Sequence, residues 1–436
     1  MRIALIAMSG VRVQNAELMA AGLTLPGFVE RSEVIASLPS LSLLTLAALT
    51  PSDIEVTYHE IADLSRDALP SGEIDLIAIS TMTAQAPDAY RVSEIARGRG
   101  IPTVIGGLHA TACPDEALEH CDAVVAGEGE EVWARIVEDA RRKKLFGIYR
   151  PEREFDLAWS PTPRYDLLDP GKYNRLTLQT SRGCPHKCEF CASSITLTPL
   201  YKVKPIDRVI AEVRAIKAVW PRPFIELADD NSFAQRGHAK DLLRELAKEN
   251  VRWFTEADIS IARDPELLAL MREAGCRQVL VGLESPEAGG LGGVETNNDW
   301  KLRQFPRSEE AVRTIQASGI TAIGCFVLGL DGHTPRIFDE VYEFAKRTSL
   351  YDVQVTVLTP FPGTPLYTRL EKAGRLTHPG QWERCTLFDV NFLPEGMAAI
   401  ELENGLRDLV GRLYDGDFVR ERREGFFRQL VRTRTA

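Results

Sequence analysis

Short, almost wholly apolar segments alternate with helical segments along most of this chain, and this alternation most constrains its fold. Strands that are apolar on both faces are typical of parallel sheets covered by helices on both sides. The first 145 residues carry apolar segments at 3–7, 55–58, 76–80, 103–105 and 123–126, separated by helical segments at 40–49, 89–97, 114–120 and 131–142.

These five segments predict a doubly wound α/β domain of the flavodoxin or Rossmann-like type over residues 1–145. Ligands of such domains bind beyond the carboxyl ends of the strands. Glycine there allows a ligand to approach the backbone closely. His109 is either a ligand contact or, as we favour, a hydrogen-bonding loop residue. The predicted ligand-binding residues are Ser80, Thr81, Thr83, Gly106, Gly107, His109, Gly127 and Glu128.

Four prolines between Pro151 and Pro170 predict a linker over residues 146–175. The alternation then resumes, with strands expected at 176–180, 224–228, 252–256, 278–283, 321–328 and 353–358. Six strand–helix units predict a partial (β/α)6 TIM barrel over residues 176–370, with its chemistry at the carboxyl ends of the strands. Residues 371–436 are expected to form a mostly helical C-terminal segment.

Composition narrows the functional classes. The 436 residues carry a net charge of −10, which opposes a nucleic-acid-binding role. No segment supplies the ~20 apolar residues that a membrane span needs. The N-terminus lacks the features of a signal peptide, so we expect a cytoplasmic protein. In a reducing compartment, the eight cysteines are expected to be metal ligands or core residues rather than disulfides.

Three cysteines, Cys184, Cys188 and Cys191, directly follow the first strand of the predicted barrel. Thiolates are the usual ligands of iron–sulfur clusters, and three of them leave one iron of a four-iron cluster open. The alternative is a zinc site with His186 as fourth ligand, but this residue lies between two of the cysteines and would strain the loop. The other five cysteines are scattered and predict no second cluster.

The Cys-x3-Cys-x-Phe-Cys segment resembles the signature of the radical S-adenosylmethionine (SAM) superfamily. The resemblance implies a [4Fe-4S] cluster on Cys184, Cys188 and Cys191, with SAM chelated to the open iron and Phe190 near its adenine. An electron from the cluster would cleave SAM to methionine and a 5′-deoxyadenosyl radical that activates a C–H bond. An external donor such as flavodoxin or ferredoxin would supply that electron.

Polar residues at the ends of later strands fit the same resemblance. Asp229, Asp230 and Asn231 follow the second barrel strand and would meet the SAM amino group, or else cap the next helix. The further SAM-binding candidates are Glu256 and Ser260 around the end of the third strand and Glu284 at the end of the fourth.

The segments ISTMTAQAPDAY, IGGLHATACPDEAL and AVVAGEGEEVW resemble the cobalamin (B12)-binding class of that superfamily. The resemblance implies cobalamin between the two domains, with its nucleotide tail near residues 80–84 and 106–109. The chain lacks the Asp-x-His-x-x-Gly motif that supplies a lower histidine ligand in many cobalamin domains. A scaffold domain without cobalamin therefore stays an alternative.

Four functions follow, in descending order. The first is cobalamin-dependent methylation of a small molecule. The second is a non-methylating radical SAM reaction: dehydration, rearrangement, ring formation or heteroatom insertion. The third is methylthiotransfer, which needs three further cysteines in the first domain, where only Cys113 and Cys121 occur. The fourth is a non-enzymatic metal-binding module. Residues 286–306 are expected to be an irregular lid in which Trp300 and Arg303 help to close the site.

Overall fold

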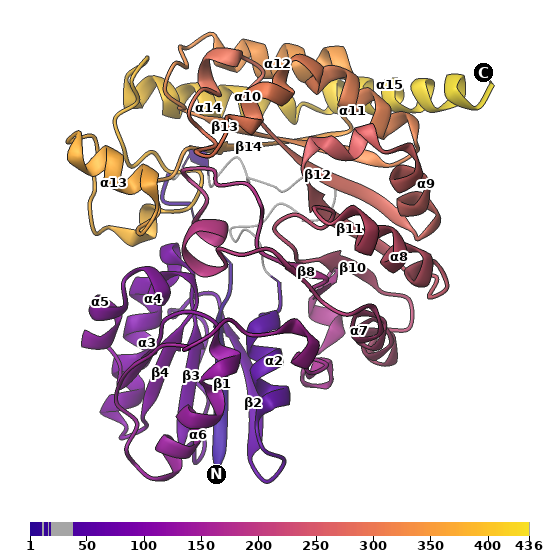
Figure 1. The fold of residues 1–436 in the computed structure, drawn as a ribbon. Coiled ribbons are helices and arrows are strands. Elements are labelled where there is room, and N and C mark those ends of the chain that lie inside the picture. The colour runs from indigo at the N-terminus through magenta and orange to yellow at the C-terminus, as the bar shows by residue number, and fades with distance from the viewer. Residues whose placement is uncertain (11–12, 16, 19–37, 436) are drawn as a thin grey trace.

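The computed structural model describes residues 1–10, 13–15, 17–18 and 38–435, and it contains two six-stranded parallel sheets (Figure 1). The first sheet has the order β2-β1-β3-β4-β5-β6. Its helices lie on both faces, because one buried core contains Leu43 and Trp133 and a separate core contains Ala89 and Ala117. The strands are β1 (Arg2–Met8), β2 (Glu55–Ile61), β3 (Leu76–Ser80), β4 (Thr103–Gly106), β5 (Ala123–Val125) and β6 (Gly147–Tyr149).

The doubly wound fold is confirmed, with two differences in detail. Strand β6 pairs with β5, so the prediction of a linker over 146–175 is wrong for its first residues. A short helix, α4 (Leu108–Ala112), directly follows β4 where only a loop was expected. The other helices are α2 (Leu41–Leu49), α3 (Ala86–Gly98), α5 (Pro114–Glu119) and α6 (Trp133–Arg141).

The second sheet forms the predicted partial barrel, in the order β14-β13-β12-β11-β10-β7. All six predicted strands are present: β7 (Leu176–Leu178), β10 (Phe224–Leu227), β11 (Arg252–Ala257), β12 (Cys276–Glu284), β13 (Thr321–Leu328) and β14 (Asp352–Val357). A two-stranded ribbon of β8 (Ser181–Arg182) and β9 (Lys202–Val203) flanks the first strand. The surrounding helices are α7 (Ile206–Val219), α8 (Arg236–Ala247), α9 (Pro265–Glu273), α11 (Ser308–Ala317) and α12 (Ile337–Thr348).

Alternation along the barrel strands separates the core from the interior of the barrel. Phe326 packs in the large hydrophobic core between strands and helices. Because successive side chains of a strand point to opposite faces, the neighbouring Cys325 faces the barrel interior. Ala257 belongs to the same core, so Glu256 also faces inward. Polar and reactive side chains are thereby directed to the inside of the barrel.

Local sequence explains where the barrel helices begin. Asp264 accepts a hydrogen bond from the backbone N–H of Leu267, and Pro265 takes the first position of α9. Thr364 and Pro365 do the same at the start of α13 (Pro365–Lys372). The C-terminal segment is mostly helical as predicted, with α14 (Ala399–Leu413) and α15 (Gly416–Thr435) after α13.

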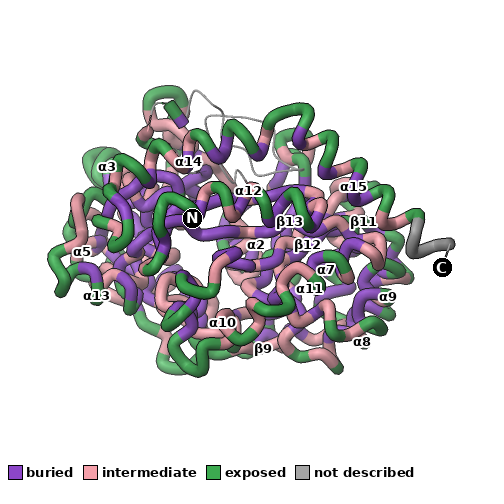
Figure 2. Tube along the Cα trace, turned by 90° about the horizontal axis from the view of Figure 1, so that it is seen from above, coloured by how far each residue is buried: buried purple, intermediate pink, exposed green. Residues whose placement is uncertain are grey.

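The segment between α13 and α14, residues 376–396, reaches back to the first domain; we call it the strap. Its two ends pair at Leu376 and Phe392. Near its tip the Trp382 indole N–H donates to Glu116 at 2.8 Å. Seen from above, buried stretches fill the middle of the molecule and exposed ones its periphery (Figure 2). Among the described residues, no helix combines the length and apolarity needed to cross a bilayer.

Candidate active site

A cavity of about 300 Å³ lies between the two domains, at the carboxyl ends of strands from both sheets. The barrel contributes polar residues to its wall, among them Gln179, Arg182, Lys204 and Asp230. Five of the predicted ligand-binding residues of the first domain also line it: Ser80, Gly106, Gly107, Gly127 and Glu128.

Gly107 is fixed by the packing of two loops at this cavity. Its φ is +105°, and a Cβ there would lie 2.4 Å from the Thr81 carbonyl oxygen. The Thr81 N–H donates to the Gly106 carbonyl at 3.1 Å, so the loops after β3 and β4 touch directly. Thr81 and Thr83 are buried and do not belong to the cavity lining. Their predicted ligand contacts therefore find no support in this geometry.

Glu128 joins the domains through ion pairs. Its carboxylate lies 2.7 Å from the Arg182 guanidinium and 2.6 Å from the Lys202 ammonium, and it accepts the Phe155 N–H at 2.7 Å. Although burial opposes ionisation, hydrogen bonds from Lys202 and Arg182 hold the pKa of Glu128 below its usual value. Arg182 also pairs with Glu130 at 2.7 Å. Glu128 thus lines the cavity while anchoring the barrel to the first domain.

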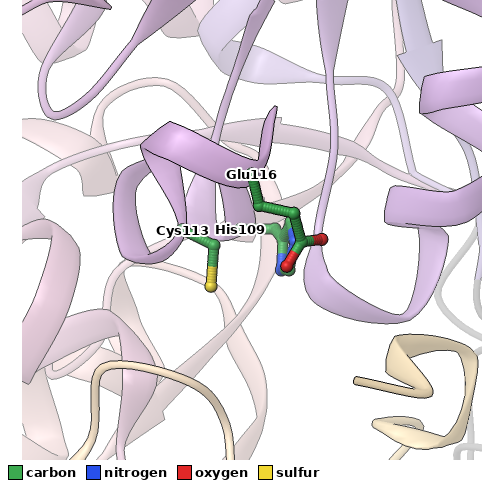
Figure 3. Close-up of side chains that lie close together, drawn as sticks. All are labelled: His109, Cys113 and Glu116. Atoms are coloured by element: carbon green, nitrogen blue, oxygen red, sulfur yellow. The ribbon is translucent and has the colours of Figure 1, made fainter. Parts of the chain in front are cut away.

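His109 lies away from the cavity, in a polar cluster with Cys113 and Glu116 (Figure 3). One donor atom from each of the three lies within 4.8 Å of the others. The imidazole is fully buried, its Nε2 is 3.0 Å from the Tyr90 hydroxyl, and burial lowers its pKa. Glu116 accepts hydrogen bonds from Tyr90 and from Trp382 of the strap. His109 therefore bonds within its own domain, beside the contact that the strap makes there.

The three cysteines of the predicted cluster site lie on one loop, residues 183–192, which we call the cysteine loop. Gly183 begins it with a φ of +82°, where a Cβ would meet the Leu200 carbonyl oxygen at 2.4 Å. The three thiols are close enough to interact electrostatically. Burial raises the pKa of Cys184 to about 11 and that of Cys188 to about 12. Such thiols become thiolates when a metal binds and releases their protons.

The residues after β10 divide into two roles. Asp229 is buried and accepts the N–H groups of Thr180 and Ser181 at 2.8 and 2.9 Å, so it ties β10 to the end of β7. Asp230 accepts the Gly183 N–H at 3.0 Å and also lines the cavity.

Asn231 and Asp230 thus both lie beside the cysteine loop. The Asn231 Nδ2 is 3.9 Å from the Cys184 sulfur, and its Oδ1 is buried without a partner among the described residues. None of the three caps α8, which begins after Gln235, so the capping alternative is wrong.

His186 contacts Asp258 and Trp300, which opposes its use as a zinc ligand. Its Nε2 is 3.2 Å from Asp258, and its ring centroid is 4.1 Å from that of Trp300. Burial would raise the pKa of Asp258, but hydrogen bonds from His186, Ser260 and Asn231 outweigh it and hold this pKa well below its usual range. The imidazole is therefore engaged with a carboxylate on β11's end rather than with the thiols.

Two further predicted SAM contacts have different surroundings. The Ser260 hydroxyl accepts a hydrogen bond from Arg236 at 2.6 Å, so it is already engaged. Burial, together with the nearby Glu226 carboxylate, raises the pKa of Glu256 to about 8. Phe190 is partly buried against the large core. Glu256 faces the barrel interior, and its raised pKa allows its carboxyl group to be protonated near neutral pH.

Glu284 forms an ion pair that sequence reasoning missed. Its carboxylate lies 2.6 Å from the ammonium of Lys301, which also donates to the Gly282 carbonyl at 2.9 Å. Although burial disfavours the ammonium, Glu284 raises the pKa of Lys301 above its usual value. Nothing in the sequence distinguishes this lysine from others.

The segment expected to be an irregular lid contains helix α10 (Trp300–Gln304) and packs on the cysteine loop. The expectation that it lacks regular structure is therefore wrong at α10. Arg303 bonds Asn298 at the surface, so its predicted part in closing the site finds no support here.

Comparison with known proteins agrees with this geometry. The radical SAM superfamily model matches residues 178–345, the B12 binding domain model matches 37–137, and a domain of unknown function matches 364–436. The chain therefore carries a radical SAM domain with a B12-binding domain in front of it.

Individual relatives cover most of the chain. Bacteriochlorophyllide d C-12(1)-methyltransferase of Chlorobaculum tepidum is 27% identical over 88% of this chain and 84% of its own length. Hopanoid C-2 methylase of Rhodopseudomonas palustris is 29% identical over 79% of this chain and 67% of its own. The structure of the radical SAM methyltransferase TsrM from Kitasatospora setae superposes with a TM-score of 0.70 at 16% identity, covering 100% of this chain and 99% of that one.

Proposed function

We propose that this protein is a cobalamin-dependent radical SAM methyltransferase that methylates a carbon of a small molecule. The observation that carries the proposal is the hydrogen bond that joins the start of the cysteine loop to the wall of the interdomain cavity. Asp230 links the two, because it lines the cavity and holds the first residue of the loop. The two curated relatives described above are both named as methyl-transferring enzymes.

The residues present fit a [4Fe-4S] cluster. Cys184, Cys188 and Cys191 supply three thiols, the number that leaves one iron free for SAM. The unpartnered Oδ1 of Asn231 beside Cys184 offers a hydrogen-bond acceptor for a bound ammonium group. When bound, the cluster supplies the electron that cleaves SAM. The chain itself holds the loop in place through Asp230 and Glu295, whose carboxylates accept the N–H groups of Gly183 and Lys187.

The cavity fits part of a corrinoid cofactor. Its first-domain wall combines glycines, which let a large planar ligand approach the backbone closely, with apolar side chains such as Leu43 and Trp133. His109 bonds to Tyr90 within its own domain, so it is not among the residues that would hold cobalamin. Arg182 and Glu128 close one edge of the cavity by joining the domains, which keeps bulk water from that edge.

A second candidate is a radical SAM reaction without methyl transfer. It is favoured by a relative of 26% identity, the anaerobic magnesium-protoporphyrin IX monomethyl ester cyclase of Rubrivivax gelatinosus. In either case the substrate is a small molecule, and flavodoxin or ferredoxin is the proposed electron donor. A cytoplasmic location stays a prediction.

The test starts from protein purified without oxygen and reconstituted with iron, sulfide and hydroxocobalamin. We expect visible absorption bands of both an iron–sulfur cluster and a corrinoid, and formation of 5′-deoxyadenosine and S-adenosylhomocysteine from SAM with a reductant. Cys184→Ala should lose the cluster bands, whereas Cys276→Ala, in the buried core, should keep them.

The products separate the candidates. 5′-Deoxyadenosine without S-adenosylhomocysteine would favour the non-methylating reaction. Protein that binds neither cluster nor SAM, and in which Cys184→Ala changes nothing, would refute both.

A further inference from the structure

The Lys301–Glu284 pair is a buried ion pair directly beside a predicted cluster ligand. The two side chains are only 10% and 8% exposed, and their charged atoms are 2.6 Å apart. Lys301 interacts electrostatically with Cys188. Buried ion pairs contribute little to stability on their own, so such a pair calls for another explanation.

The local backbone is shaped around this pair. Glu284 has a φ of +62°, a left-handed conformation that is costly for a residue other than glycine. The register of β12 with β13 shifts between Gly282 and Glu284. A Cβ at Gly282 would lie 2.6 Å from the Glu284 carboxylate and 2.9 Å from the Lys301 ammonium. Strand β12 therefore ends in a strained turn that has room for both charged groups only because residue 282 is glycine.

Lys301 is also held at a fixed place relative to the cysteine loop. Cys188 and Glu295 form an antiparallel bridge. The Glu189 N–H donates to the Val294 carbonyl at 2.8 Å, and the Thr296 N–H donates to the Lys187 carbonyl at 2.9 Å. The segment that carries Lys301 thus runs alongside the cysteine loop, hydrogen-bonded to it on both sides of Cys188.

Both members of the pair act electrostatically on Cys188, in opposite senses. The Lys301 ammonium lowers the pKa of the Cys188 thiol more than the Glu284 carboxylate raises it. At low dielectric a nearby cation stabilises added negative charge strongly. Reduction of a cluster adds one electron and no proton, so it adds one unit of negative charge.

We propose that Lys301 is a positioning residue whose ammonium raises the reduction potential of the cluster held by Cys188. This inference rests on the proposed function, because it requires the cluster. Glu284 holds the ammonium in place and partly offsets its charge. The long segment after β12 would therefore act on electron entry, rather than only as a cover for the site.

The experiment is a redox titration of protein reconstituted anaerobically with iron and sulfide, with dithionite as the electron donor and electron paramagnetic resonance as the readout. Lys301→Met removes the charge and keeps the stem. At a fixed potential we expect its ratio of reduced to oxidised cluster to fall about tenfold, which for one electron equals 59 mV. Lys301→Arg should stay within about twofold of the wild type, and Glu284→Gln should shift the ratio upward.

A charge effect shifts the ratio of reduced to oxidised cluster in opposite directions in Lys301→Met and Glu284→Gln. Structural damage would shift this ratio in the same direction in both variants. Arg423→Met is the control, because Arg423 pairs at 3.2 Å with the buried Asp352 at the start of β14, the end of the strand that lies away from the cysteine loop. Its cluster potential should equal that of the wild type.

If Lys301→Met alone loses the cluster, the comparison of Glu284→Gln with Lys301→Met/Glu284→Gln still isolates the lysine charge. Equal potentials in those two would overturn the inference. Wild-type protein that assembles no cluster would instead overturn the proposed function.

Discussion

The carboxyl ends of the two parallel sheets face one cavity, but the residues that line it differ between the two domains. The first domain offers glycines such as Gly106 and Gly107 together with apolar side chains such as Trp133. The barrel offers charged side chains, including Arg182 and Asp230, and Asp230 also holds the start of the cysteine loop. The difference teaches that similar strand–helix alternation can build a surface for holding a large ligand or one for reactive chemistry. Side chains at the strand ends decide which.

The largest expected effect, and the strongest test of this difference between the domains, is the replacement of one cysteine of the cysteine loop. Cys191→Ser should abolish the iron–sulfur absorption and reduce 5′-deoxyadenosine formation below detection, because a three-cysteine site has no spare ligand. Cys113→Ser, in the first domain, is the matched change and should keep both. Iron and sulfide content together with product chromatography measure the outcome. Loss in both variants would mean that the two domains do not divide the work as proposed.

The join between the domains is the next test. Arg182→Met leaves Glu128 and Glu130 without their shared partner in a largely buried place. Removing one member of a buried ion pair costs about 3–5 kcal/mol, so chemical denaturation should show a large loss of stability. Arg153→Met removes a surface pair with Glu131 and should change the free energy of unfolding by at most about 1 kcal/mol. Similar losses in both would show that Arg182 does not couple the domains.

A smaller effect is expected from the backbone of the first domain. Gly107→Ala places a Cβ against the Thr81 carbonyl at a φ of +105°, which should cost about 1–3 kcal/mol and weaken hydroxocobalamin binding. Gly98→Ala has open space around it in α3 and should be neutral or stabilise by about 0.5–1 kcal/mol. Thermal unfolding and equilibrium dialysis measure the two quantities. Unchanged cobalamin affinity in Gly107→Ala would leave the glycine a purely structural role.

The last test is the pH dependence of stability that arises in the barrel interior. Glu256 has a pKa of about 8 in the folded protein, against an ordinary value of 4.5. Between these values the folded state binds more protons than the unfolded state, so stability falls as pH rises, by at most about 1.4 kcal/mol per pH unit. Glu256→Gln should flatten the slope between pH 5 and 8, as measured by denaturant unfolding. The exposed Glu119→Gln should retain it, and a slope unchanged in Glu256→Gln would contradict the assignment.

The fold was largely predictable because strand and helix periodicities are local. All eleven expected strands are present, whereas β6 was missed because it lies directly before the proline-rich stretch from Pro151 that indicated a linker. The cysteine loop was predictable because its three ligands are close in sequence. Asp229 was harder to interpret, because a carboxylate after a strand can face a ligand or, as here, bind the backbone of a neighbouring strand.

Long-range partners were not predictable. Lys301 meets Glu284 only because a 17-residue excursion returns to the end of β12. Trp382 meets Glu116 across 266 residues of sequence. Such contacts depend on how complete elements pack, and no local pattern of residue types specifies them.

The strap affects the order in which tertiary contacts can form during synthesis of the chain. Its contacts with Glu116, and those of Asp389 with the N–H groups of Gln14 and Asn15, join residues made near the end of synthesis to residues made near its start. The two halves can each bury their own core earlier, because their strands pair within each half. The contacts between the strap and the first domain therefore form only once residue 389 has left the ribosome, after the strands of both sheets have been made.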